Sequence, residues 1–214
     1  MSETAATVIM IRHGETDWNQ LRLMQGQTDI PLNDKGIAQA QAAALALADY
    51  APSHIYSSDL SRAAQTARIA ATLLGLGVDL DARLRERHFG IIQGLTMDQF
   101  QELHPHVHAQ FVKREPNFVI PGGESASEFH RRAILCVQEI ASRHSNGTVA
   151  VISHGGVLSA LLRQTFGISP AAPRNFALEN ASLNIFRISE EQFSLVSWGI
   201  TRHLPRLDAN SALV

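Results

Sequence analysis

Hydrophobic and polar positions along this chain form two alternating patterns. Short, largely apolar runs rich in β-branched residues predict buried strands over 8–12, 54–57, 78–80 and 148–153. Longer stretches with apolar residues at helical spacing predict helices over 35–48, 60–74, 125–143 and 156–166. Two further apolar runs, over 182–189 and 193–199, are separated by a short polar segment and predict a hairpin at the edge of a sheet.

Polar residues mark the expected helix starts. Asn33 is placed as the N-cap of the first long helix, and Ser58 with Asp59 can cap the helix that follows the second strand. Thr or Ser followed three residues later by Gln or Glu forms a capping-box pattern at 96–99 and again at 125–128. These signals support the helical segments that the apolar spacing predicts.

Strands that alternate with helices and end in a late hairpin predict an α/β fold, a three-layer α/β/α sandwich on a mostly parallel sheet. The chain has 214 residues and shows no internal repeat or low-complexity linker. We therefore expect one domain over 1–214. The segment 95–121 interrupts the pattern, and we expect it to cover the site as a cap-like insertion.

Composition and charge restrict the classes of protein that this chain can represent. A hydrophobic fraction of 45% suits a globular core, and a net charge of -2 gives no sign of a nucleic-acid or anionic-membrane binder. The chain has neither a signal-peptide pattern nor an apolar stretch near the roughly 20 residues of a membrane span, so we expect a cytoplasmic protein. The single cysteine, Cys136, lies in a helical pattern and is expected to be a packed core thiol.

Two of the predicted strands end in a histidine followed by glycine. The run over 8–12 leads into His13-Gly14, and the run over 148–153 leads into His154-Gly155-Gly156. A lone histidine at a strand end is more commonly a core residue, but chemistry in α/β sheets lies just past the carboxyl ends of the strands. Two histidines at one such edge, with the permanent cation of Arg12 beside the first, indicate a site that binds and attacks a phosphoryl group.

Four segments in this order resemble the histidine phosphatase superfamily, which includes the cofactor-dependent phosphoglycerate mutases. They are Arg12-His13-Gly14-Glu15-Thr16, Ser58-Asp59-Leu60-Ser61-Arg62-Ala63, Leu84-Arg85-Glu86-Arg87 and Ser153-His154-Gly155-Gly156. The likeness extends from about Val8 to His203. It implies a phosphohistidine mechanism with no metal and no cofactor.

The resemblance also gives the site residues their expected roles. His13 is the candidate nucleophile, surrounded by a clamp of Arg12, Arg62 and His154. Glu86 is the acid/base. The resemblance places the phosphate-binding contacts at Asn19, Gln25, Gly26 and Gly155.

Arg62 and Glu86 could also be purely structural residues with no part in catalysis. Arg62 falls in the first turn of its helix, where a cation works against the helix dipole, and a bound anion would explain its presence. Taken alone, it could equally be a solvated surface arginine, and the resemblance of the flanking segment to the family is what argues against that. Glu86 stands between Arg85 and Arg87, which by itself is typical of a structural ion-pair cluster. As an acid/base it should be partly buried, with the two arginines pointing elsewhere or contacting substrate.

Three functions remain as alternatives. The first is a phosphomonoesterase acting on small phosphorylated metabolites, and the second is a 2,3-bisphosphoglycerate-dependent phosphoglycerate mutase. The third, a non-catalytic phospho-ligand binding module, is disfavoured because none of the expected catalytic residues is lost. The mutases carry a longer insertion with paired arginines that grip the substrate carboxylate, and here only Lys113 and Arg114 could stand in. A homodimer is one candidate assembly.

The stretch His104-Pro105-His106-Val107-His108 has the look of a metal-ligand set, but it lacks companion Cys or carboxylate ligands at matching spacing. We expect it to be a solvated loop that enters a helix.

Overall fold

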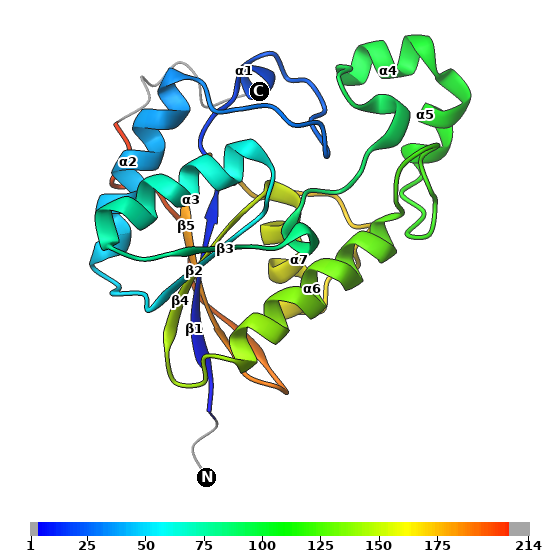
Figure 1. The fold of residues 1–214 in the computed structure, drawn as a ribbon. Helices are drawn as coiled ribbons and strands as arrows, with labels where there is room; N and C mark the ends of the chain where they lie inside the picture. The colour runs from blue at the N-terminus through cyan, green and yellow to red at the C-terminus, as the bar shows by residue number, and fades with distance from the viewer. Residues whose placement is uncertain (1–3, 206–214) are drawn as a thin grey trace.

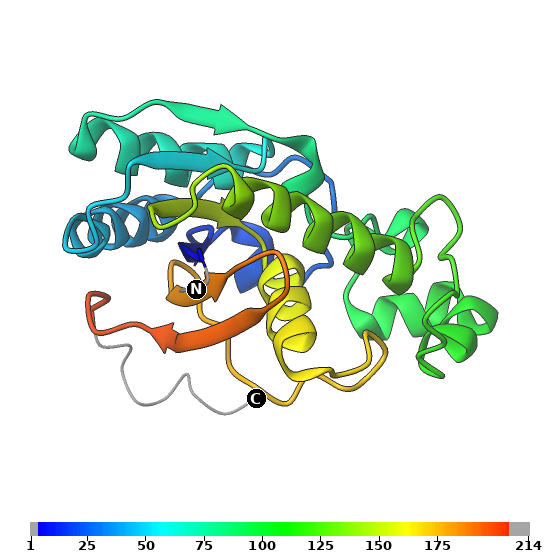
Figure 2. The same ribbon diagram turned by 90° about the horizontal axis from the view of Figure 1, so that it is seen from below.

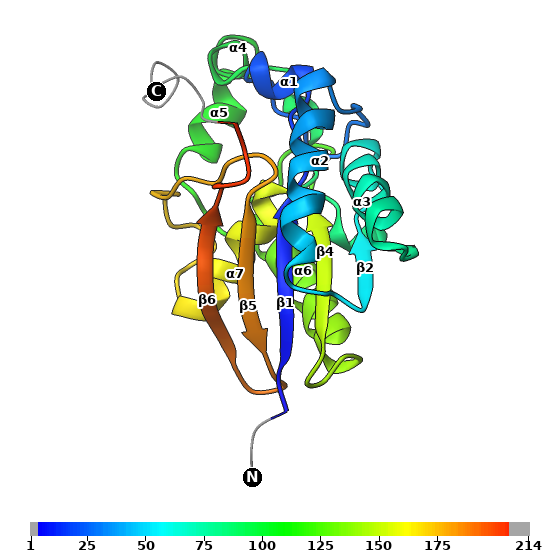
Figure 3. The same ribbon diagram turned by 90° about the vertical axis from the view of Figure 1, so that its left-hand side faces the viewer.

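A computed structural model describes residues 4–205, which form a six-stranded sheet in the order β3-β2-β4-β1-β5-β6. The strands are β1 (Ala6–Arg12), β2 (His54–Ser57), β3 (Val78–Leu80), β4 (Thr148–Ser153), β5 (Leu183–Ile188) and β6 (Phe193–Ile200). Strand β5 is antiparallel to its neighbours β1 and β6, whereas the pairs among β1 to β4 are parallel (Figure 3). The predicted mostly parallel sheet with a hairpin at its edge is confirmed.

Helices cover both faces of the sheet. The α-helices of the described chain are α1 (Asp17–Gln20), α2 (Asp34–Ala48), α3 (Ser61–Leu74), α4 (Met97–Leu103), α5 (Pro105–Phe111), α6 (Ala126–Ser142) and α7 (Gly155–Phe166). Two short 3-10 helices, η1 (Ala82–Leu84) and η2 (Gly90–Ile92), connect β3 to α4. Helices α2 and α3 lie on one face and α6 and α7 on the other, as Figures 1 and 3 show, so the three-layer fold is confirmed.

The central strands are apolar on both faces because both faces are buried. In β1, Ile9 and Ile11 pack toward α2 and α3, whereas Val8 and Met10 pack toward α6 and α7. Successive side chains of a strand point to opposite faces, so a strand between two helical layers needs an uninterrupted apolar run. The strand also begins two residues earlier than the sequence predicts, at Ala6.

The start of α3 differs from the sequence prediction. The expected caps do not close this helix, whose N-cap is Leu60 with no side-chain hydrogen bond. Instead Asp29, from a distant loop, accepts hydrogen bonds from the Ser61 backbone N–H at 2.7 Å and from the Ser61 hydroxyl at 2.8 Å. Asp59 is drawn away by its ion pair with Arg85. The N-cap at the start of α2 and the capping boxes of α4 and α6 form as predicted.

The segment 95–121 contains α4 and α5 and lies at one end of the molecule, beyond the carboxyl ends of the strands (Figures 1 and 2). It encloses a separate apolar cluster centred on Ile92, Phe100 and Ile120. The histidine-rich stretch enters α5 at once, with Pro105 in its first turn, so little of it is loop. Within residues 4–205, no helix is both long and apolar enough to cross a membrane.

Candidate active site

The parallel pairing of β1 and β4 brings His13 and His154 together. Arg12 is in register with Ser153, so each histidine is the first residue past its strand. The backbone N–H of His13 donates to the carbonyl of Ser153 at 2.9 Å, and the two imidazole rings lie 5.2 Å apart between centroids. Both side chains are buried at the carboxyl edge of the sheet.

A backbone carbonyl fixes the orientation of the His13 ring. Its Nδ1 lies 2.7 Å from the carbonyl oxygen of Gly14. A carbonyl oxygen only accepts hydrogen bonds, so Nδ1 carries the proton and Nε2 keeps its lone pair. The side-chain amide of Asn180 donates to the carbonyls of His13 at 2.9 Å and of Gly14 at 3.3 Å, which holds this turn in place. No motif in the sequence pointed to Asn180, because it is distant in the chain.

Arg62 and Arg12 place two cations beside His13 without a carboxylate partner. Arg62 is fully buried and donates to the backbone carbonyls of Gly26 at 2.7 Å and Thr28 at 2.9 Å. Arg12 donates to the carbonyl of Leu178. The Nε atoms of both arginines are buried and have no partner among the described residues. Burial lowers the pKa of each guanidinium to about 10, because the charged form is poorly solvated there.

The two histidines are held in their neutral form. Burial lowers the pKa of His13 well below its ordinary 6.5, and the charges of Arg62 and then Arg12 lower it further. The pKa of His154 is lowered in the same way, by burial first and by Arg62 next. His154 Nε2 lies 2.8 Å from the hydroxyl of Ser58, and its buried Nδ1 lacks a partner among the described residues. A neutral imidazole at pH 7 is the form that can act as a nucleophile.

The Glu86 carboxylate is partly buried and held by two backbone N–H groups. Its Oε1 accepts from the backbone N–H of Arg87 at 2.8 Å, and its Oε2 accepts from that of Gly156 at 2.8 Å. The side chain of Arg85 points away and pairs with Asp59. The guanidinium of Arg87 donates to a backbone carbonyl and lies over the ring of Phe89. Neither arginine neutralises Glu86 directly.

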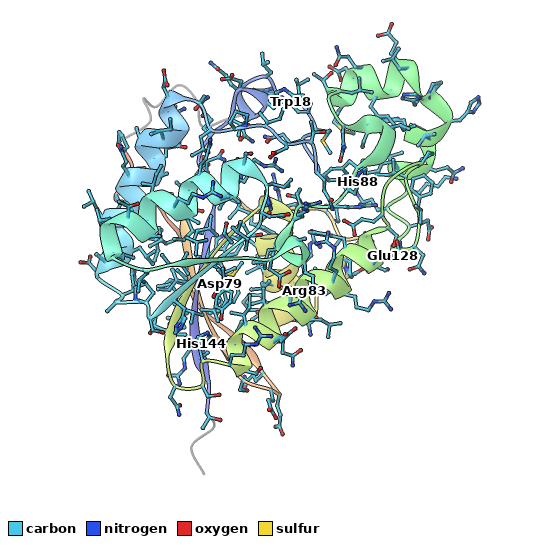
Figure 4. All side chains as sticks on the ribbon, in the orientation of Figure 1. Trp18, Asp79, Arg83, His88, Glu128 and His144 are labelled. Carbon is cyan, nitrogen blue, oxygen red and sulfur yellow. The ribbon has the colours of Figure 1, made fainter. Side chains whose placement is uncertain are left out.

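An ion pair between Arg132 and Glu124 supports the segment that carries Glu86. Arg132 NH2 lies 2.6 Å from Glu124 Oε1 and 3.3 Å from the carbonyl oxygen of Glu86. Arg132 NH1 donates to the carbonyls of Arg83 at 2.7 Å and Arg85 at 3.0 Å. Arg83, labelled in Figure 4, lies beside α6 and pairs with Glu139 of that helix. Arg132 thus holds three carbonyls of the segment 83–86, a role that its place in a capping-box helix did not suggest.

His88, labelled in Figure 4, continues this support toward the cap. Its backbone N–H donates to Glu124 Oε1 at 2.8 Å, and its carbonyl accepts from the backbone N–H of Glu124 at 3.0 Å. Both the side chain and the backbone of Glu124 therefore join the loop after Pro121 to the segment that carries Glu86.

These residues surround one small pocket of about 130 Å³, which we call the inner pocket. It is lined by Arg12, His13, Asn19, Leu23, Met24, Gln25, Gly26, Arg62, Glu86, Phe89, Gly155, Gly156 and Arg174. His154 lies behind this wall, against the His13 ring. The side-chain oxygen of Gln25 is buried with no partner in the described part of the chain, and Asn19 also caps α1 through Thr16. Gly156 belongs to the fourth of the resembling segments but had no expected role, and no motif pointed to Arg174.

A second pocket of about 360 Å³, which we call the outer pocket, adjoins the first. The two share Met24, Glu86, Phe89, Gly156 and Arg174. Arg114 from the cap lines the outer pocket, whereas Lys113 does not. The sequence offered only Lys113 and Arg114 in place of the paired arginines of the mutases. In the structure Arg114 lines the pocket, and its companion there is Arg174, from outside the cap, in place of Lys113.

Three arginines line the inner pocket, namely Arg12, Arg62 and Arg174, and Glu86 is the only carboxylate among its lining residues. Across residues 4–205, no group of three or more His, Cys, Asp or Glu side chains is arranged to hold a metal ion. The expected core position of Cys136 is confirmed, since it is buried and burial raises the pKa of its thiol to about 12.

Replacing Gly156 by alanine should displace Glu86. A Cβ at this position would lie 2.0 Å from Glu86 Oε1 and 2.9 Å from the ring of Phe129, so the carboxylate must move. Misplacement of a reacting group by about 1 Å costs roughly 10²-fold in rate, and we expect a loss of that size in kcat.

The variant Gly77→Ala is the matched comparison for this prediction. There the added Cβ has nothing within 4 Å and the residue lies outside both pockets, so little or no loss is expected. Thermal unfolding of both variants separates displacement of Glu86 from loss of the fold. Equal kcat losses in the two variants would contradict the role given to Gly156.

Comparison with known proteins agrees with this geometry. The family model of the histidine phosphatase superfamily (branch 1) matches residues 8–201. The chain is 37% identical over 203 residues to phosphoglycerate mutase-like protein 4 of Arabidopsis thaliana, which covers 93% of this chain and 87% of the relative. It is 36% identical over 200 residues to the metal-independent phosphoserine phosphatase of the same plant, which covers 92% of this chain and 82% of that protein.

A solved structure shows the same fold. A mycobacterial glucosyl-3-phosphoglycerate phosphatase in complex with VO3 superimposes with a TM-score of 0.79 at 33% identity, covering 91% of this chain and 99% of that one. The protein described here belongs to the histidine phosphatase superfamily, branch 1. The family resemblance read from the four sequence segments is confirmed.

Proposed function

We propose that this protein is a phosphomonoesterase that hydrolyses small phosphorylated metabolites through a phosphohistidine intermediate. The observation that carries the proposal is the inner pocket, where His13, Glu86 and three arginines without a carboxylate partner among the described residues line one space of about 130 Å³. Relatives named as phosphatases, on phosphoserine and on glucosyl-3-phosphoglycerate, support the choice of hydrolysis.

In the first step, His13 Nε2 attacks the phosphorus of the ester. Its lone pair is available because the proton sits on Nδ1, facing the carbonyl of Gly14. Arg12 and Arg62 lie beside the phosphoryl oxygens, with the buried imidazole of His154 behind the His13 ring, and the two guanidinium charges stabilise the charge on the group in transfer. The P–O ester bond breaks as the N–P bond forms. Glu86 in its protonated form gives a proton to the departing alkoxide.

In the second step, water takes the place of the departed alcohol. The Glu86 carboxylate removes a proton from this water, which attacks the phosphohistidine. The N–P bond breaks, inorganic phosphate leaves and Glu86 is again protonated for the next turnover. The hydrogen bonds from Arg87 and Gly156 keep the carboxylate beside both pockets throughout.

Phosphoglycerate mutase is the second candidate, and one observation favours it. Arg114 and Arg174 both line the outer pocket and could grip the carboxylate of a phosphoglycerate. A mutase, however, must also shield its phosphohistidine from water and hold a second hydroxyl in line. The cap offers only two short helices for this, α4 and α5. We therefore place hydrolysis first.

Product analysis separates the two candidates. The protein is incubated with a panel of phosphomonoesters and with 3-phosphoglycerate, the latter with and without 2,3-bisphosphoglycerate as primer. We expect inorganic phosphate from several esters and little or no 2-phosphoglycerate, because water reaches the phosphoenzyme before a second acceptor does. Interconversion of the phosphoglycerates at rates well above phosphate release would make the mutase assignment correct.

Four expectations from the sequence belong to the same proposal. They are a single domain over 1–214 with 95–121 as its cap, a small phosphorylated metabolite as partner, a homodimer as one candidate assembly and a cytoplasmic location. Gel filtration with light scattering tests the assembly directly.

A further inference from the structure

The outer pocket begins where the leaving group of a bound phosphate ester must lie. It shares Glu86 and Gly156 with the inner pocket, and Glu86 is the residue that would protonate the leaving oxygen. A substrate whose phosphoryl group faces His13 therefore extends its alcohol into the outer pocket. The walls of this pocket describe the alcohol that fits.

The walls are largely apolar and enclose more space than a small metabolite fills. Aromatic and other apolar side chains form much of the lining, namely Met24, Phe89, Phe111, Phe129, Ala160 and Pro170. The volume of about 360 Å³ falls within the range of roughly 300–1,000 Å³ that is typical of small-molecule sites. The three-carbon chain of a serine or a glycerate would leave most of this surface uncovered.

The same pocket carries cations that the protein does not neutralise. Arg163 is satisfied by the carbonyls of Ser169 and Ala172, both at 2.7 Å, and so helps to hold the loop after α7. Arg114 and Arg174, by contrast, form neither an ion pair nor a side-chain hydrogen bond with any residue of the described chain. Both residues are exposed, so water solvates their charges in the free protein, and a ligand that covers them would strengthen their attraction for an anion.

Arg174 lies next to the inner pocket. A Cβ placed on Gly155 would lie 3.7 Å from Arg12 Nε and 3.8 Å from Arg174 NH1, so both guanidinium groups border the same space. Arg114 reaches the pocket from the cap, from a left-handed backbone conformation with φ of 57° just after α5. The two arginines approach the pocket from separate parts of the chain.

We propose that the natural substrate is the phosphate ester of an alcohol with a bulky apolar body and a carboxylate, held by Arg114 and Arg174. This rests on the proposed phosphatase function. The apolar body would cover the aromatic walls, and the planar carboxylate matches the hydrogen-bonding fork of a guanidinium. A carboxylate carries a single charge and costs less to desolvate in an apolar pocket than a second, doubly charged phosphate would.

The proposal is tested with a matched series of alkyl phosphates. Benzyl phosphate, 4-carboxybenzyl phosphate and 4-(aminomethyl)benzyl phosphate share the reacting centre and differ in the distal charge. O-phosphoserine supplies a carboxylate without the apolar body. We expect kcat/KM for the carboxybenzyl ester to exceed that for benzyl phosphate by about 10-fold, the size of a charge-assisted hydrogen bond, and the aminomethyl ester to be the poorest of the three. O-phosphoserine should fall at least about 10-fold below the carboxybenzyl ester, because it buries no ring.

Arginine variants locate the carboxylate. Arg114→Gln and Arg174→Gln are compared by the ratio of kcat/KM for carboxybenzyl to benzyl phosphate, which cancels any change in phosphate binding common to both esters. Each variant should reduce this ratio toward one. Lys113→Gln removes the same charge from the adjacent residue, whose side chain contacts Gln110 outside the pocket, and should leave the ratio as in the wild type.

The outcomes separate this inference from the proposed function. Hydrolysis of benzyl phosphate by the wild type reports on the phosphatase activity alone. If benzyl phosphate is hydrolysed but the carboxylate gives no advantage, the inference is wrong while the phosphatase proposal stands. The same conclusion follows if Lys113→Gln lowers the ratio as much as Arg114→Gln, because long-range charge would then explain the preference. If no ester in the series releases phosphate, the phosphatase proposal itself fails.

Discussion

His13→Ala is expected to lower phosphatase kcat by roughly 10⁴-fold or more, since the variant lacks the atom that accepts the phosphoryl group. The ring sits at the end of β1 with Nδ1 tied to Gly14 and Nε2 facing the inner pocket. Wild-type protein quenched during turnover with ³²P-labelled substrate should carry acid-labile, alkali-stable phosphate. The variant should carry none.

The control for this experiment is another histidine variant. His54 is exposed and begins β2, at the end of the strands remote from the site, where Figure 4 shows its neighbour His144. His54→Ala should keep the labelling and the turnover of the wild type. Near-normal turnover in His13→Ala would exclude His13 as the nucleophile. Unfolding temperatures of the two variants exclude a general loss of structure.

Glu86→Gln is expected to slow the hydrolysis of esters with basic leaving groups by about 10²–10⁴-fold, because the departing alkoxide then lacks its proton donor. Benzyl phosphate should show this loss in full. An ester such as p-nitrophenyl phosphate should be affected far less in its first step, since its leaving group needs no proton. The comparison is best made on kcat/KM, which reports on steps up to the first irreversible one.

The geometry around Glu86 adds a second expected effect of this substitution. Both carboxylate oxygens accept backbone N–H groups, from Arg87 and from Gly156. An amide offers one oxygen, so one of these donors loses its partner, at a cost of about 1–3 kcal/mol in the free energy of unfolding. Urea unfolding measures this cost. An equal fall in kcat/KM for both esters, in a variant that remains folded, would show that Glu86 is not the leaving-group acid.

Local sequence determined much of the fold because its signals are short-range. The apolar runs gave the strands, helical spacing gave the long helices, and capping residues such as Asn33, Thr96 and Ser125 form the bonds expected of them. The predicted position of His13 and His154 at one sheet edge needed only the rule for parallel strands. The exceptions, such as the start of α3, are places where a distant residue competes. Asp29 caps α3 because the loop before α2 returns to that helix, and no local pattern encodes that return.

Tertiary structure alone decided how the candidate site is held and what surrounds it. The sequence by itself determined the family, the three-layer fold and the residue types that a phosphoryl site needs, since these depend on periodicity and on short motifs. It did not reveal the Gly156 contact with Glu86, the Arg132 support, the Asn180 bonds or the meeting of Arg114 with Arg174. Each of these joins segments far apart in the chain. Hydrogen bonds and close packing depend on distances of a few ångströms, which sequence separation does not specify until the chain has folded.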